Sequence, residues 1–105
     1  MLLNINDIKN LCHDENIIIT KHCKNRLKER VITVDDIKNV INTGEIIEQY
    51  ENDKPFASCL ILGCSMNNNH VHIIVSVDNG FLYIISSYYP NENKWESDFK
   101  TRKGY

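Results

Sequence analysis

Residues 70–89, HVHIIVSVDNGFLYIISSYY, contain two runs rich in β-branched and aromatic residues, separated by Asp78-Asn79-Gly80. Because alternate side chains of a strand point to the same face, Val71, Ile73, Val75 and Val77 share one side. The Asn-Gly pair is typical of a tight hairpin turn, where both central residues have positive φ. The stretch therefore predicts an antiparallel hairpin of strands 70–77 and 81–89, with the valine-rich face in the core.

Two more strands are predicted before this hairpin, at residues 45–50 and 58–64. Their apolar residues no longer follow helical spacing and include many β-branched side chains. The intervening segments 52–55 and 66–69 are rich in Asn, Asp and Pro, which favour turns. Four sequential strands with short connections predict an antiparallel meander.

Helical spacing of apolar residues marks three segments in the first 44 residues: 4–15, 20–30 and 33–43. The last begins with a capping-box pattern, Thr33 followed three positions later by Asp36, and ends before Gly44. Ile17–Ile19 form a short β-branched run between the first two segments. Helices followed by strands predict an α+β domain, with N-terminal helices packed on a four-stranded antiparallel sheet.

The composition fits a single domain covering residues 1–105, with 42% hydrophobic and 25% charged residues. No apolar run is long enough to span a bilayer, and MLLNINDIK lacks the apolar centre of a signal peptide. We therefore expect a cytoplasmic protein with no membrane partner. The four cysteines are expected to be reduced, mostly buried thiols.

Basic residues gather in one stretch, residues 20–30, TKHCKNRLKER, although the formal net charge is only −2. With Thr20 as the N-cap, His22, Arg26 and Arg30 follow at i, i+4 and i+8 on one helix face. Acidic residues crowd the segment 45–53. The basic strip fits an anionic ligand, and it equally fits ion pairing with that acidic segment.

The side chains opposite the valine-rich face include His72, and together with His22 it supplies the imidazole groups that acid–base catalysis most often uses. Arginine guanidinium groups suit phosphate. These groups fit metal-free RNA cleavage, in which a 2′-hydroxyl attacks the adjacent phosphate. A helix N-terminus disfavours a protonated histidine, which favours His22 as the base. The predicted catalytic residues are His22, Arg26, His72 and Tyr88, and the predicted substrate-binding residues are Lys21, Arg30, Trp95 and Arg102.

Each of these residues also has a structural interpretation. A histidine in a strand can be a satisfied core group, and Trp95 with Phe99 can anchor the polar C-terminal tail. Cys12-His13, His22-Cys23 and His70-x-His72 lack the paired spacing of a structural zinc site. No glycine-rich phosphate loop, GxSxG or HExxH motif occurs. We expect no metal and no cofactor.

Several motifs taken together resemble a small bacterial family, domain-of-unknown-function family 4258, over residues 18–102. They are His22-x3-Arg26-x3-Arg30, Gly44-Glu45-Ile46-Ile47-Glu48-x-Tyr50, Cys59-Leu60-Ile61-Leu62-Gly63, His72-Ile73-Ile74, and Tyr88-x-Pro90 followed by Trp95. Two departures are Cys23, where alanine is usual, and Asn67-Asn68-Asn69, where a glycine-arginine pair is expected. By this likeness His22, Arg26, Arg30, His72, Tyr88 and Trp95 occupy the family's marked positions.

The resemblance implies a fold similar to the RelE, ParE and barnase-like (BECR) toxins. It implies a toxin of a type II toxin-antitoxin pair, acting as a metal-independent endoribonuclease (mRNA interferase-like) on free or ribosome-bound RNA. The implied partner is a protein antitoxin with a zinc-finger, MqsA-like half. The alternative is a non-catalytic ParE-like toxin, or a protein-interaction module on the same fold.

Overall fold

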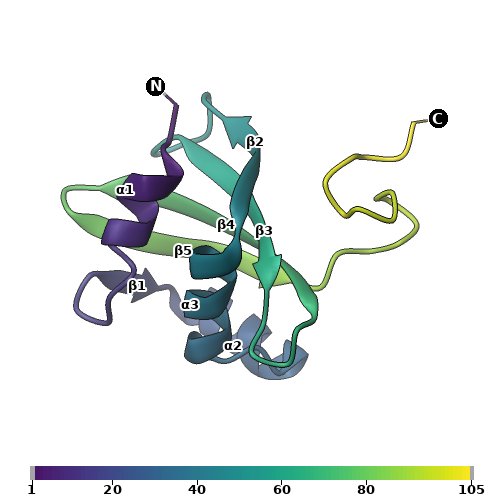
Figure 1. Cartoon of the computed structure of the whole chain (residues 1–105). Helices are drawn as coiled ribbons and strands as arrows, with labels where there is room; N and C mark the ends of the chain where they lie inside the picture. The colour runs from purple at the N-terminus through teal and green to yellow at the C-terminus, as the bar shows by residue number, and fades with distance from the viewer. Residues whose placement is uncertain (1, 105) are drawn as a thin grey trace.

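The computed structural model describes residues 2–104, which form an α+β domain with three helices and a five-stranded mixed sheet (Figure 1). The elements are α1 (Ile5–Asn10), β1 (Ile17–Ile19), α2 (Lys21–Arg30), α3 (Val34–Thr43), β2 (Glu45–Tyr50), β3 (Ser58–Cys64), β4 (His70–Asp78) and β5 (Phe81–Tyr88). The strand order is β1-β5-β4-β3-β2. β1 pairs with β5 in parallel, and the other neighbours are antiparallel.

The predictions of α2, α3 and the β4–β5 hairpin are confirmed, because local side-chain chemistry determines them. The Thr20 side chain caps α2 by accepting from the Cys23 N–H at 3.2 Å. Thr33 and Asp36 form the predicted capping box at 3.0 and 2.9 Å. Asn79 and Gly80 have φ values of 53° and 82°, as the Asn-Gly turn requires.

The predicted antiparallel meander is confirmed as β2–β5, but the prediction of a sheet with only four strands was wrong, because Ile17–Ile19 forms a fifth strand parallel to β5. The first helix is also shorter than predicted: α1 ends at Asn10, and Leu11 is its C-cap. Turns at residues 11–16 then redirect the chain, with the Asn16 and Ile17 N–H groups donating to the His13 carbonyl. This reversal brings the three isoleucines alongside β5.

The helices cover one face of the sheet, and this face holds the core. Val71, Ile73 and Val75 of β4 have no exposed surface and pack in one cluster with apolar residues of all three helices, as predicted. At Gly63 of β3 a Cβ would overlap the backbone carbonyl of Val40 in α3. The missing side chain therefore lets α3 lie directly on the sheet.

No helix among residues 2–104 packs on the opposite face, and irregular segments cover parts of it. Near the start of β4 lies the C-terminal tail, residues 91–104, where Trp95 is 4% exposed. Elsewhere the β2–β3 loop crosses the face and brings Phe56 to 6.3 Å from Tyr83, ring centre to ring centre. Among residues 2–104 no helix has the length and apolar character needed to cross a membrane.

Candidate functional site

The basic face of α2 lines a cleft of about 350 Å³, which we call the α2 cleft. Its lining residues are His22, Cys23, Arg26, Arg30, Ile85 and Ser86. The spacing of four residues along α2 places His22, Arg26 and Arg30 on the same side of the helix, as predicted. The cleft thus joins a titratable imidazole and two guanidinium groups to the edge of β5.

Buried side chains and a hydrogen bond to β5 fix the orientation of α2. Cys23 and Leu27 bury the inner face of the helix, at 2% and 5% exposure. Arg30 Nη1 donates a 2.7 Å hydrogen bond to the Ser87 carbonyl of β5. Arg26 forms a long ion pair of 3.7 Å with Glu29, and its side chain is 51% exposed. Arg26 therefore remains accessible to an anionic ligand.

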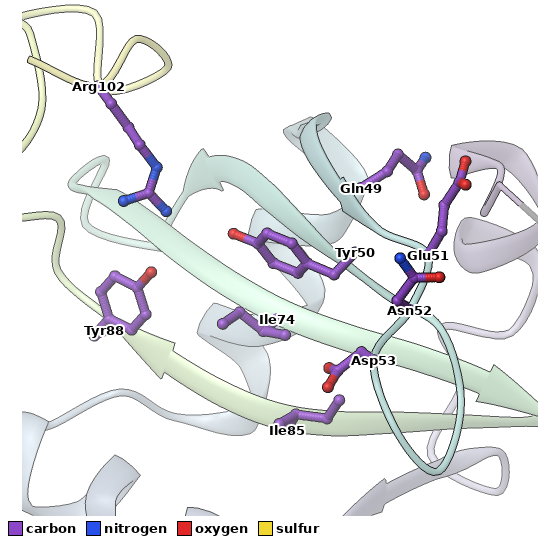
Figure 2. Close-up of a pocket in the computed structure, with 9 residues that line it drawn as sticks. All are labelled: Gln49, Tyr50, Glu51, Asn52, Asp53, Ile74, Ile85, Tyr88 and Arg102. Atoms are coloured by element: carbon purple, nitrogen blue, oxygen red, sulfur yellow. The ribbon is translucent and has the colours of Figure 1, made fainter. Parts of the chain in front are cut away.

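A larger hollow of about 650 Å³, the sheet pocket, lies on the face opposite the helices (Figure 2). Figure 2 shows the hydroxyl groups of Tyr50 and Tyr88 pointing towards the Arg102 guanidinium, with Ile74 below them. Ile85 lines both the sheet pocket and the α2 cleft, so the two hollows adjoin. The sheet pocket is lined by Gln49, Tyr50, Glu51, Asn52, Asp53, Ile74, Ile85, Tyr88 and Arg102.

One end of the sheet pocket is a hydrogen-bonded network around Glu48. Arg102 donates from Nε and Nη2 to the two Glu48 oxygens at 2.8 and 3.0 Å, and the Tyr50 hydroxyl also donates to Glu48. These bonds, that of Arg102 most of all, lower the pKa of Glu48. Burial and the bond to Glu48 raise the pKa of Tyr50 to about 12. Tyr50 is therefore a neutral hydrogen-bond donor at physiological pH.

His72 lies beneath the C-terminal tail and has no exposed surface. Its Nε2 is 2.8 Å from the Phe99 carbonyl, which can only accept, so Nε2 carries the proton. Its ring packs in T-shaped contacts with Trp95 and Tyr88, at centroid distances of 4.6 and 5.5 Å. Burial lowers the pKa of His72, which keeps the ring neutral. The other ring nitrogen, Nδ1, has no hydrogen-bond partner among residues 2–104.

The tail that covers His72 is itself ordered by internal bonds. Backbone hydrogen bonds join Glu96 to Thr101 at 2.7 Å and Lys103 to Lys94 at 3.0 Å. The Arg102 guanidinium carbon lies 4.6 Å from the centre of the Trp95 ring. Trp95 is thus an anchor for the tail, which is one of its two interpretations from sequence.

The predicted site residues fall into two groups. His22, Arg26 and Arg30 meet in the α2 cleft, whereas His72 and Tyr88 lie against Trp95 and Arg102 of the tail. Lys21 is exposed and does not line either hollow. Tyr88 connects the two groups, because it lines the sheet pocket next to Ile85. Burial raises the pKa of the Tyr88 hydroxyl.

Within the part of the chain that the structure describes, the acidic segment 45–53 does not pair with α2, so that interpretation of the basic strip was wrong. Its acidic side chains form ion pairs with the tail instead, Glu45 with Lys100 at 2.7 Å and Glu48 with Arg102. Sequence reasoning also missed Tyr50 and Glu48 as site residues. Their spacing in β2, two residues apart on one strand face, is the signal that could have indicated them.

Within residues 2–104 no group of three His, Cys, Asp or Glu side chains is arranged to hold a metal ion. All four cysteines are free thiols, and three of them are buried. Cys59, the most deeply buried, has its pKa raised to about 12 by that burial.

A family model described as a domain of unknown function, DUF4258, matches residues 19–89, more than half of the chain. The match contains the α2 cleft, Tyr50, His72 and Tyr88, whereas Trp95 and Arg102 lie beyond it. No curated protein and no solved structure matched the chain. On the extent of the family match, the chain belongs to the DUF4258 family.

Proposed function

We propose that this protein is a metal-independent endoribonuclease that binds RNA across the α2 cleft and the adjoining sheet pocket. The observation that carries the proposal is the convergence of His22, Arg26 and Arg30 in one accessible cleft beside β5. Two guanidinium groups offer planar donors to a phosphodiester, and an imidazole beside them can move a proton. Helices on one sheet face and an opposite face without helices are compatible with a RelE-like fold.

In the proposed reaction the 2′-hydroxyl of RNA attacks the adjacent phosphorus, and the bond from phosphorus to the 5′-oxygen breaks. His22 accepts the proton of the 2′-hydroxyl, and a water molecule or the Tyr88 hydroxyl protonates the leaving 5′-oxygen. The products are a 2′,3′-cyclic phosphate and a 5′-hydroxyl end. Arg26 and Arg30 stabilise the charge that develops on the phosphate oxygens.

His72 takes a different place in this proposal from the one that sequence indicated. Because its ring is covered by Trp95 and its Nε2 bonds to the Phe99 carbonyl, it has no path to a bound phosphate while the tail is in place. We assign His72 to positioning the tail and the neighbouring Tyr88 rather than to proton transfer.

The test is cleavage of a labelled RNA by the purified protein in the presence of EDTA. We expect products with 2′,3′-cyclic phosphate ends, and no cleavage when the attacking 2′-hydroxyl is replaced by hydrogen. His22→Ala should lower the rate by about 100-fold or more. The matched control is His13→Ala, because His13 is exposed in the turn before β1. A His22→Ala variant that cleaves at the wild-type rate would refute the mechanism.

RNA binding can be tested separately from cleavage. Arg26→Gln should weaken binding of a 2′-deoxy substrate analogue. It should also reduce, by about one, the slope of the logarithm of the binding constant against the logarithm of the salt concentration. Lys24→Gln is the matched control, since it removes a charge from the other side of the same helix. Equal effects of the two variants would show that the α2 cleft is not the binding site.

A second candidate function is a non-catalytic ParE-like toxin or protein-binding module. The observation that favours it is the burial of His72, which leaves His22 as the accessible histidine of the cleft among the described residues. In either case we propose a toxin of a type II pair that is neutralised by a protein antitoxin. Transcript mapping after induced expression decides between them: growth arrest with intact RNA supports the second candidate.

A further inference from the structure

The side of α2 opposite the cleft forms an apolar groove of about 440 Å³ against the start of α3, which we call the α2–α3 groove. Two of its side chains are unusually exposed for their type, Val31 at 76% and Val34 at 41%. The spacing of Lys24, Leu27, Lys28 and Val31 along the helix turns them away from His22, Arg26 and Arg30. The lining residues are Ile19, Lys24, Leu27, Lys28, Val31, Ile32, Thr33 and Val34.

Val31 is in a conformation that its side chain disfavours. It follows the last residue of α2 with φ 57° and ψ 46°, the left-handed region in which glycine is usual. A β-branched residue there is an outlier, and strain of this kind concentrates at functional positions. Glycine would relieve the strain and remove an exposed apolar side chain, so folding alone does not explain the valine.

The charges at the groove indicate what covers it. Lys24 and Lys28, one helical turn apart, flank the apolar lining, and none of the described residues that line the groove is acidic. Ile19 at one end belongs to β1, the edge strand of the sheet. An occupant therefore needs apolar side chains for Val31 and Val34 and carboxylates for the two lysines.

We propose that the α2–α3 groove docks an acidic amphipathic segment of a partner protein. Its apolar face packs on Leu27, Val31 and Val34, and its carboxylates bind Lys24 and Lys28. Covering Val31 removes its apolar surface from water, which offsets the strain of its backbone. The site does not depend on RNA cleavage, because the α2 cleft uses a different face of the helix.

The probe is a library of random 16-residue peptides displayed on phage and selected on the immobilised full chain. We expect enrichment of acidic sequences whose apolar residues recur every three or four positions. The strongest peptide is then synthesised and titrated by fluorescence anisotropy. Lys24→Glu with Lys28→Glu should weaken its binding at least tenfold, and Arg26→Gln should leave it unchanged.

Val31→Gly is the decisive variant, because it separates docking from folding. Its melting temperature should be at least that of the wild type, and up to a few degrees higher, since glycine accepts positive φ. Peptide binding should nevertheless weaken at least tenfold, and RNA cleavage should be unchanged.

Three outcomes would overturn the proposal. One is the absence of enriched peptides, or the selection of neutral or basic ones. Another is wild-type peptide affinity in Val31→Gly. The third is a concentration-dependent dimer, seen by sedimentation, that Val31→Asp abolishes, because the groove would then be an interface between two copies of this chain. None of these outcomes tests the ribonuclease proposal, which is tested by RNA cleavage in the His22→Ala variant.

Discussion

Ile73 and His72 are neighbours in β4, lie on opposite faces of the sheet, and are both fully buried. Ile73 is surrounded by apolar side chains of the helices and strands. His72 is enclosed by Tyr88, Trp95 and the Phe99 carbonyl. The helix-covered face is therefore stabilised by apolar area, to which many residues contribute, whereas the tail-covered face depends on a few specific contacts.

The largest expected effect contrasts two isoleucines on these faces. Ile73→Ala should lower the free energy of unfolding by about 4 kcal/mol, because it leaves a cavity in the core. Ile74→Ala should cost about 1 kcal/mol, because Ile74 is half-buried in the open sheet pocket. Urea denaturation of the two variants measures the difference. Equal losses would mean that the two faces are equally packed.

Trp95→Ala should have the next largest effect, about 3 kcal/mol, because it removes the buried ring that joins the tail to His72. Hydrogen exchange of residues 94–103 should rise towards that of an unfolded chain, while exchange in β3 and β4 is retained. Trp95→Phe keeps a ring and is the matched control. Uniformly faster exchange across the sheet would show that the tail is part of the global core.

Sequence reasoning succeeded where neighbouring residues determine the structure. Asn79-Gly80 specifies its hairpin, Thr33 and Asp36 cap α3, and the residues of α2 keep one basic face. In each case the interacting groups lie within a few positions of one another. Their chemistry is therefore visible in a short window of sequence.

Features that join distant parts of the chain could not be predicted in this way. Three isoleucines are too short a run to indicate a strand, and β1 exists because β5 offers a parallel edge. The alternation of β4 placed His72 on the correct face but did not show that Phe99 and Trp95 cover it. Exposure, which decides whether a histidine can transfer a proton to a substrate, depended on the tail.

The burial of His72 makes the stability of the tail-covered face depend on pH. Its pKa is lowered by burial, so the unfolded chain binds a proton at a higher pH than the folded chain does. The free energy of unfolding should have its full value above about pH 6.5 and should fall as the pH decreases below that value. Urea denaturation between pH 7 and pH 5 measures the slope.

His72→Gln tests this assignment, because an amide nitrogen can still donate to the Phe99 carbonyl but does not titrate. The variant should be less stable than the wild type at pH 7. Its free energy of unfolding should no longer decrease between pH 7 and pH 5. An unchanged slope would assign the effect to another group. Asp36 and Glu48, whose pKa values are also lowered, contribute only at more acidic pH.

The smallest expected effect is that of Arg102→Lys, which keeps the charge but loses the planar guanidinium. Lysine cannot donate to both Glu48 oxygens while it stacks on Trp95. Because the Arg102 side chain is 57% exposed, solvent screens its ion pair, and the melting temperature should fall by about 2 °C or less. The pKa of Glu48, measured by carboxyl NMR, should rise towards its ordinary value as the strongest of its hydrogen bonds is lost. If Arg102→Lys instead released the tail as fully as Trp95→Ala, the ion pair rather than the buried ring would hold this face of the sheet closed.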